Sequence, residues 1–387
     1  MIEAAEVVDQ AGPVRAGEEL DLARVDRYLR KRIPGLTGPP EVGQFARGAS
    51  NLTYLLRYPD RDLVLRRPPF GRKAKSAHDM LREARVMRLV RPAYPVVPEV
   101  LLVCDDPVVM GCDFFVMERI AGVIPRQDLP AALGLDEAGT RQLCERVIDK
   151  LVELHTIPLI PDPSPKGEGR TLPPPKEEGR TLPSPSGRGA GGEGLLSLGK
   201  GEGYVQRQVE GWSRRFRDAR TDDVSDFEAV MGWLAANRPA GEVAIRVIHG
   251  DFRFDNVVLD PADPLRVIGV LDWEMATLGD PLMDLGNSLA YWVEAGDDEY
   301  FRMTRRQPTN APGMLTRSEV VAYYAARTGL PVANFDFYLA FGLFRLAVIV
   351  QQIWRRYREG ATKDPQFARF GPLVDYLDGR CRRLCGV

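Results

Sequence analysis

Apolar residues in the first 120 positions follow two kinds of pattern, which predict both helices and strands. Leu22, Val25 and Leu29 recur at helical spacing, whereas short apolar runs bounded by turn residues are typical of strands. The predicted elements are helices over 20–34 and 77–90 and strands over 52–56, 63–65, 100–103 and 114–117. Strands grouped around one internal helix predict a small lobe of the α+β class, mostly antiparallel.

Beyond Gly122 the helical pattern dominates. Helices are predicted over 137–154, 203–217 and 227–234 and again after Pro281, while two continuous apolar runs, 243–248 and 267–271, are typical of buried strands. We therefore predict two lobes, a small one over residues 1–120 and a larger, mainly helical one over 121–387. The most apolar stretch, Phe337–Val350, is interrupted by Arg345 and is shorter than the ~20 residues of a membrane span, so a buried core helix is predicted.

One segment follows neither pattern. Residues 161–194 are rich in Pro, Gly and Glu and contain a ten-residue repeat, KGEGRTLPPP at 166–175 and KEEGRTLPSP at 176–185. So few apolar residues cannot offset the entropy lost on ordering, which predicts a disordered insertion within the helical lobe. A Pro-rich ligand for a partner domain is the alternative.

Composition narrows the range of functions. The 387 residues are 44% hydrophobic and 27% charged with a formal net charge of −2, so nothing favours a nucleic acid or an anionic membrane as partner. The five cysteines are scattered and odd in number, and they form neither a disulfide framework nor a paired zinc motif. The first residues, MIEAAEVVDQ, lack the apolar core of a signal peptide, and the cytoplasm is the expected compartment.

Candidate chemistry is concentrated in the short β segment of the helical lobe. A predicted strand leads into His249, Asp251 and Asn256, and the next apolar strand ends at Asp272. We expect these side chains to converge at adjacent strand ends. Phosphoryl transfer needs such a set, because one carboxylate orients the acceptor hydroxyl and takes its proton while other oxygen ligands hold Mg²⁺ against the phosphates. The alternative is a buried polar turn in which the same groups satisfy loop amides.

The spacing of these residues resembles that of a known family. The sequence H-G-D at 249–251, with Asn256 five positions after the Asp, resembles the kinase catalytic loop in the form found in aminoglycoside phosphotransferases and choline kinases. This resemblance implies a protein-kinase-like two-lobed fold with ATP as the phosphoryl donor. It implies Asp251 as the catalytic base, Arg253 near the γ-phosphate in place of the usual Lys, and His249 as a further catalytic residue of the loop. Asn256 and Asp272 then become the ligands of Mg²⁺.

By the same resemblance the first lobe binds the nucleotide. Gly48, Ser50 and Asn51 lie between two strand-like runs and are expected to cover the phosphates. Where most kinases carry Lys this chain has Arg66, which is expected to bind the phosphates and to be held by Glu83 of the following helix. The alternative raised by Arg66 is a degenerate lobe that binds nucleotide poorly.

The connection between the lobes is expected to form the adenine-binding hinge. The resemblance places Met117 as the gatekeeper and assigns backbone groups of Glu118 and Ile120 to adenine. An edge strand that simply leaves a sheet would have the same sequence pattern.

Further motifs resemble one branch of the superfamily. The segments NLTY at 51–54, LRRPP at 65–69, YVQRQ at 204–208, LDWE at 271–274 and GDP at 279–281 resemble the kinase-like domain fused to acyl-CoA dehydrogenases and its freestanding bacterial relatives. The acceptor implied is a small-molecule hydroxyl, on a hydroxylated acyl group such as a hydroxyacyl-CoA. A nucleotide-binding module without chemistry and an aminoglycoside kinase are the alternative hypotheses.

Four other polar residues are given structural expectations. Asp280 is expected to cap a helix, Asp284 to brace the catalytic loop, and His155 to pack at a helix end. Arg345 lies on a late helix, and late helices wall the acceptor site in this family. A salt bridge is the first expectation for Arg345, and contact with an anionic substrate is the second.

Overall fold

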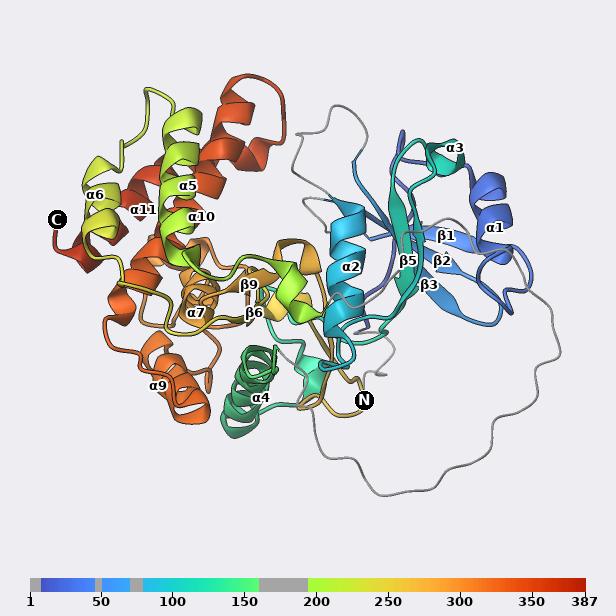
Figure 1. The fold of residues 1–387 in the computed structure, drawn as a ribbon, viewed down its shortest axis with the longest axis horizontal. Coiled ribbons are helices and arrows are strands. Elements are labelled where there is room, and N and C mark those ends of the chain that lie inside the picture. The colour runs from blue at the N-terminus through green and yellow to red at the C-terminus, as the bar shows by residue number, and fades with distance from the viewer. Residues whose placement is uncertain (1–7, 46–50, 70–78, 160–193) are drawn as a thin grey trace.

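The computed structural model describes residues 8–45, 51–69, 79–159 and 194–387. Gly48 and Ser50 of the predicted phosphate loop lie outside these residues, as does nearly all of the predicted insertion at 161–194. In the described part, a β-sheet with its covering helices forms one lobe and a larger, mainly helical assembly forms the other (Figure 1). This is the two-lobed α+β arrangement that the pattern predicts.

The first lobe is built on a five-stranded antiparallel sheet in the order β1-β2-β3-β5-β4. Its strands are β1 (Glu41–Gln44), β2 (Leu52–Arg57), β3 (Asp62–Arg67), β4 (Val100–Cys104) and β5 (Phe114–Glu118). Alternate residues face opposite sides of the sheet. Leu65 and Val116 pack with α1 (Leu22–Arg30) and α3 (Pro107–Met110), whereas Val64 and Phe115 pack on the side of α2 (Met80–Val90), which faces the second lobe (Figure 1).

Helix α2 brings one charged side chain into the core. The helix begins at Asp79, whose carboxylate accepts a hydrogen bond from the Arg82 N–H at 2.9 Å. Ala84 and Met87 then pack against the sheet, and Glu83 is buried beside them with 1% of its surface exposed. Because a buried carboxylate is costly without a partner, Glu83 points to a cation within the fold.

The second lobe is mainly helical and is organised around α10. Its helices are α4 (Glu137–His155), α5 (Tyr204–Ala219), α6 (Glu228–Ala236), α7 (Pro281–Ala290), α8 (Glu299–Met303), α9 (Arg317–Thr328), α10 (Phe335–Arg358) and α11 (Phe370–Cys385). Helix α10 packs against α5, α7 and α11. Among the described helices, only α10 is long and apolar enough to cross a membrane, and 67% of its most apolar window is buried inside the fold, as in a core helix.

Two short antiparallel pairs lie between these helices. Strand β6 (Arg246–Ile248) pairs with β9 (Thr277–Gly279), and β7 (Val257–Leu259) pairs with β8 (Val267–Val270). The strand predicted over 243–248 is shorter than expected, because the Val243 N–H donates to the Asp280 carboxylate at 2.8 Å instead of to a strand. The pattern does not predict β9, whose three residues are too few to show a periodicity.

Candidate active site

The catalytic-loop candidates follow β6 at a sharp turn. Gly250 has φ of 81°, a left-handed conformation that favours glycine, and a Cβ at this position would lie 2.9 Å from the Met275 carbonyl oxygen. His249 precedes this turn and Asp251 follows it. The H-G-D sequence therefore has a steric cause, since no larger residue fits between the two functional side chains.

The carboxylate of Asp284 on α7 anchors this turn. It accepts hydrogen bonds from the backbone N–H groups of His249 at 2.7 Å and Gly250 at 2.8 Å. It also contacts His155 Nε2 at 3.1 Å, and the Asp284 side chain is fully buried. Burial alone would raise the pKa of Asp284, but hydrogen bonds from His155 and the loop lower it below its ordinary value. The expected bracing role of Asp284 is confirmed.

The expectations for Asp280 and His155 are also confirmed. Asp280 is the N-cap of α7 and accepts from the Leu282 N–H at 2.8 Å. His155 ends α4, is 1% exposed, and places its second ring nitrogen 2.7 Å from the Tyr324 hydroxyl.

His249 holds the strand end that leads to Asp272. Its Nε2 lies 3.0 Å from the Leu271 carbonyl, its Nδ1 accepts from the Asp251 N–H at 3.3 Å, and its ring packs edge-on against Trp273. The His249 side chain is fully buried. Because both ring nitrogens are engaged away from open space, His249 is a positioning residue, and the expectation that it acts catalytically needs this correction.

Asn256 and Asp272 meet across the β7–β8 pair. Val257 lies opposite Val270, and the Leu271 N–H donates to the Asn256 carbonyl at 2.8 Å, which places Asp272 next to Asn256. The side-chain amide of Asn256 donates to the Asp251 carbonyl at 2.9 Å and approaches Asp251 Oδ2 at 3.4 Å. The three residues predicted to converge therefore do so.

Arg253 lies beside the predicted base. Its guanidinium contacts Asp251 Oδ2 at 3.3 Å and Asp255 Oδ1 at 3.1 Å, and it covers the ring of Tyr291 at 4.6 Å. Burial alone would lower the pKa of Arg253, but the carboxylates of Asp251 and Asp255 more than offset it, so the pKa is raised and the cation is secure.

Arg66 joins the two lobes at the site. Its guanidinium donates to Asp272 Oδ1 at 2.6 Å, and its Nε lies 3.2 Å from Glu83 Oε2. Asp272 has φ of 67°, a conformation that Asp tolerates better than most residues. Burial raises the pKa of Glu83 to about 7, although the charge of Arg66 opposes this shift. In Asp272, burial would also raise the pKa, but the attraction of Arg66 is stronger and lowers it below the ordinary value. The predicted pairing of Arg66 with Glu83 is present.

Two further links between the lobes have no counterpart in the predictions from sequence. Asn51 Nδ2 donates to Glu274 Oε2 at 2.8 Å, so this residue of the predicted phosphate loop reaches the segment after Asp272. Arg82 of α2 donates to the carbonyls of Glu274 at 2.7 Å and Ala276 at 2.6 Å. The motif LDWE contained the only signal for Glu274, and no sequence signal distinguishes Arg82 from other helix arginines.

The segment predicted as the hinge, 117–120, begins at the end of β5, and the expectation for the Glu118 backbone needs one correction. Met117 is buried within β5, and the Glu118 N–H donates to the Glu99 carbonyl at 2.9 Å, which leaves Glu118 at most its carbonyl for adenine. The Glu118 carboxylate accepts from Arg91 at 2.8 Å. Ile120 makes no backbone hydrogen bond to another described residue, so its backbone groups are available.

A sequence profile described as the phosphotransferase enzyme family matches residues 41–318, more than half of the chain. The chain belongs to this phosphotransferase family. The recognition of an aminoglycoside phosphotransferase-like and choline kinase-like chain from its motifs is confirmed.

Individual relatives of this phosphotransferase family member agree. Acyl-CoA dehydrogenase family member 10 of Mus musculus is 31% identical over 373 residues, which covers 96% of this chain. The chain spans only 32% of that relative's length. A crystal structure from Ralstonia eutropha, of a protein named among the aminoglycoside phosphotransferases, has a TM-score of 0.72 at 26% identity, covering 95% of this chain and 99% of that chain.

A more distant solved structure supports the fold alone. A thermostable mutant of aminoglycoside phosphotransferase APH(4)-Ia, in a ternary complex with AMP-PNP and hygromycin B, has a TM-score of 0.52 at 16% identity. The match covers 94% of this chain and 98% of that chain. The protein-kinase-like fold class predicted from the sequence is thereby confirmed.

The side chains of this phosphotransferase site fit a magnesium nucleotide. The Asn256 amide nitrogen donates to Asp251, and its Oδ1 accepts no hydrogen bond from any described residue. Asp272 keeps one carboxylate oxygen beyond its bond to Arg66. Hard oxygen donors of this kind suit Mg²⁺, which takes its remaining ligands from phosphates and water. In the described residues no group of three His, Cys, Asp or Glu side chains could hold a metal by itself, and a site completed by phosphates does not require one.

Proposed function

We propose that this chain is an ATP- and Mg²⁺-dependent phosphotransferase that moves the γ-phosphoryl group to a hydroxyl of a small molecule. The observation that supports this most directly is the convergence of Asp251, Asn256 and Asp272 at adjacent strand ends. Membership of the phosphotransferase family supports the reaction class. The complex of APH(4)-Ia with AMP-PNP supports an adenine nucleotide as donor.

The protein's own groups would act mainly by position and charge. Asp251 would accept a hydrogen bond from the acceptor hydroxyl and take its proton as the new bond to phosphorus forms. Arg253, 3.3 Å from the Asp251 carboxylate, would hold that carboxylate in the orientation needed for the acceptor. Asn256 and Asp272 would hold Mg²⁺, which neutralises charge on the phosphates when bound.

The acceptor that we propose is a hydroxylated acyl group such as a hydroxyacyl-CoA. Support comes from the likeness to acyl-CoA dehydrogenase family member 10, in which the matching segment is about a third of a longer chain. The aminoglycoside kinase hypothesis is less favoured, because a polycationic antibiotic would be repelled by Arg345, a buried cation of α10.

Two substitutions test the proposed reaction. Asp251→Asn should abolish phosphoryl transfer, by at least about 1,000-fold in kcat, because the amide cannot take a proton. It should leave the Kd for Mg-ATP within a few-fold of the parent value. Asp272→Ala should instead weaken Mg²⁺-dependent nucleotide binding. Unimpaired turnover by purified Asp251→Asn protein would overturn the assignment of the base.

One observation bears on the hypothesis of a nucleotide-binding module without chemistry. The 2.6 Å bond between Arg66 and Asp272 occupies one oxygen of a proposed metal ligand. Binding of Mg-ATP in a thermal-shift assay, with neither hydrolysis nor transfer to any member of a broad panel of hydroxyl acceptors, would favour the module over the enzyme.

A further inference from the structure

Arg345 is a buried cation without the carboxylate expected for it. It lies on α10 with 5% of its surface exposed, and within the described part of the chain its guanidinium makes no hydrogen bond or ion pair. Its one close partner is the indole ring of Trp212 on α5, 5.3 Å from the guanidinium carbon. The salt bridge predicted from sequence is therefore absent from the described residues. A cation this deeply buried normally has a counter-charge.

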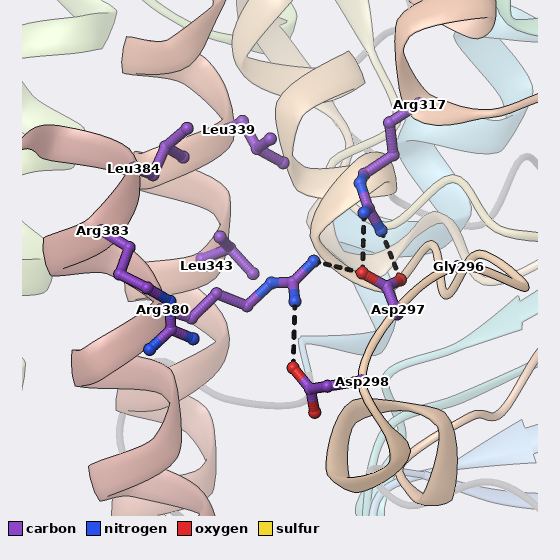
Figure 2. Close-up of a pocket in the computed structure, with 9 residues that line it drawn as sticks. All are labelled: Gly296, Asp297, Asp298, Arg317, Leu339, Leu343, Arg380, Arg383 and Leu384. Atoms are coloured by element: carbon purple, nitrogen blue, oxygen red, sulfur yellow. Dashed lines mark hydrogen bonds and ion pairs between the residues drawn. The ribbon is translucent and has the colours of Figure 1, made fainter.

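Other arginines of the same lobe show what a compensated cation looks like. A cavity of about 450 Å³ between α10, α11 and the loop before α8 is lined by Arg317 and Arg380, among other residues (Figure 2). Both arginines bind the carboxylate of Asp297, at 2.8 Å and 2.7 Å respectively. These two arginines are thus neutralised by an acid of the fold, whereas the described residues place no acid in contact with Arg345.

Arg345 and the proposed catalytic base both influence one tyrosine electrostatically. Tyr291, which follows α7, is covered by the Arg253 guanidinium, and Arg253 contacts Asp251. The charges of Asp251 and Arg345 both act on the Tyr291 phenol: burial raises its pKa most, Asp251 raises it further, and Arg345 opposes this. Helix α10, which carries Arg345, also packs against α7, the helix that precedes Tyr291 and supplies Asp284 to the catalytic loop.

A second arginine lies on the same indole. Arg215 of α5 is 4.6 Å from the Trp212 ring, and Trp212 is fixed by a 3.0 Å hydrogen bond from its Nε1 to Gln208. Burial lowers the pKa of Arg215, and the nearby charges of Arg214 and Arg345 lower it further. Two cations that share one aromatic surface without an acid between them repel each other, and an anion placed there would relieve the repulsion.

We propose that Arg345, assisted by Arg215, binds an acidic group of the acceptor, a carboxylate or a phosphate, and so orients the acceptor hydroxyl toward Asp251. This deepens the proposed function and rests on it. A guanidinium suits the task because its planar donors match carboxylate and phosphate oxygens in pairs. Trp212 supplies a rigid face that holds Arg345 in place before the acceptor arrives. Such a site would favour anionic acceptors over neutral ones.

The test compares Arg345→Met with Arg355→Met, which removes an exposed arginine of the same helix that is ion-paired to Glu359. Three acceptors are used: a hydroxyacyl-CoA, the same hydroxyacyl group on N-acetylcysteamine, and the free hydroxy acid. Arg345→Met should raise KM for the anionic acceptor 10- to 100-fold, with kcat and the KM for ATP within about twofold. An effect confined to the CoA ester assigns the phosphates, and one confined to the free acid assigns the carboxylate.

Several outcomes would overturn the anion site. They are an unchanged KM in Arg345→Met, an equal rise with the neutral N-acetylcysteamine ester, or an equal rise in Arg355→Met. Arg345→Lys, which keeps the charge but not the paired donors, should recover part of the affinity. Arg345→Met should unfold at no lower temperature than the parent, because no internal ion pair is lost, so a loss of affinity cannot be ascribed to unfolding.

Direct binding separates failure of this site from failure of the proposed reaction. Calorimetric titration of hydroxyacyl-CoA and of the hydroxy acid, with Mg-AMP-PNP present, needs no turnover. Binding that is lost in Arg345→Met, in a parent protein that transfers no phosphate, would support the anion site and overturn the phosphotransfer. Turnover with binding insensitive to Arg345 would do the reverse. Failure of the parent to bind either probe would overturn the anion site as well.

Discussion

Buried charges in this protein are compensated by a few identifiable neighbours, so single substitutions have large and specific effects. Glu83 has 1% of its surface exposed and Arg66 has 8%, and the same guanidinium serves Glu83, Asp272 and, at 3.8 Å, Glu274. A lysine at this position would offer a compact charge with no fork to span the three acids. Arg66, which stands where most kinases have a lysine, is thus surrounded by three carboxylates.

We expect Arg66→Ala to lower the free energy of unfolding by about 3–5 kcal/mol, because it leaves Glu83 as an unpaired buried acid. Arg66→Lys should fall between this variant and the parent. Urea denaturation at pH 8, above the pKa of about 7 of Glu83, measures the difference. Arg57→Ala on the neighbouring strand is the control, since its ion pair with Asp62 is half-exposed and long, at 3.7 Å. Equal losses in the two variants would refute this account.

The carboxylate of Asp297, shown in Figure 2, leads to a prediction about pH. Burial alone would raise the pKa of Asp297, but hydrogen bonds from Arg317 and Arg380 lower it to about 2, against 3.8 as the ordinary value. The folded protein therefore keeps Asp297 ionised where the unfolded chain protonates it, so this stabilisation is complete above about pH 4 and is lost as the pH falls toward 2. It amounts to about 2 kcal/mol.

Asp297→Asn should accordingly be less stable than the parent at pH 7, and the gap should narrow as urea denaturation is repeated down to pH 3. A gap that stays constant across this range would mean that packing of the side chain, and not its charge, is responsible.

At the scale of elements, the close crossing of α7 and α10 supports the catalytic loop. A Cβ on Gly286 would overlap the Tyr338 carbonyl oxygen, and one on Gly342 would overlap the Gly286 carbonyl oxygen. The same helix α7 supplies Asp284, whose position under the catalytic loop depends on this crossing. Helix packing thus determines where the loop amides are held.

We expect Gly342→Ala to cost about 3 kcal/mol, because the two helix backbones must separate to admit a methyl group. Gly232→Ala in α6 is the matched control, since a Cβ there meets nothing within 4 Å. The control should gain about 0.5–1 kcal/mol from reduced freedom of the unfolded chain. Thermal unfolding of both variants measures the contrast, and a destabilised control would contradict the steric argument.

The limits of prediction from sequence differ between elements. The spacing from Asp251 to Asn256 spans a single loop, so the sequence alone places both residues. Asn51 and Glu274 meet although 223 positions separate them, and only the arrangement of the lobes brings them together. His249 is of a residue type common in catalysis and lies next to the predicted base in sequence. Its burial against Trp273 depends on packing, which the sequence pattern does not predict.

At the scale of the whole molecule, the lobes are joined by polar contacts made by a few side chains near the site. Arg82 contributes two bonds from α2 to the segment after Asp272, Arg66 binds Asp272 itself, and Asn51 donates to Glu274. A few polar contacts can rearrange more easily than the apolar cores of the lobes. We therefore expect the angle between the lobes to change when nucleotide binds.

Arg82→Ala tests this coupling. It should raise the KM for ATP several-fold and speed hydrogen exchange at the amides of 273–277, because their carbonyls lose the anchor on α2. Arg88→Ala is the control: Arg88 lies on the same helix, and among the described residues its guanidinium donates only to the Val100 carbonyl of its own lobe, at 3.5 Å. Equal exchange in the two variants would show that Arg82 does not restrain the segment.

The β7–β8 pair has a consequence for finding distant homologues. Asn256 and Asp272 are neighbours because Val257 lies opposite Val270, while the chain between the strands, 260–266, forms only the connecting turn. Natural selection can lengthen or shorten that turn without moving either side chain, whereas an insertion between Asp251 and Asn256 would disturb the 2.9 Å bond from the Asn256 amide to the Asp251 carbonyl. A search that fixes the first interval and lets the second vary should recover members that a rigid motif overlooks.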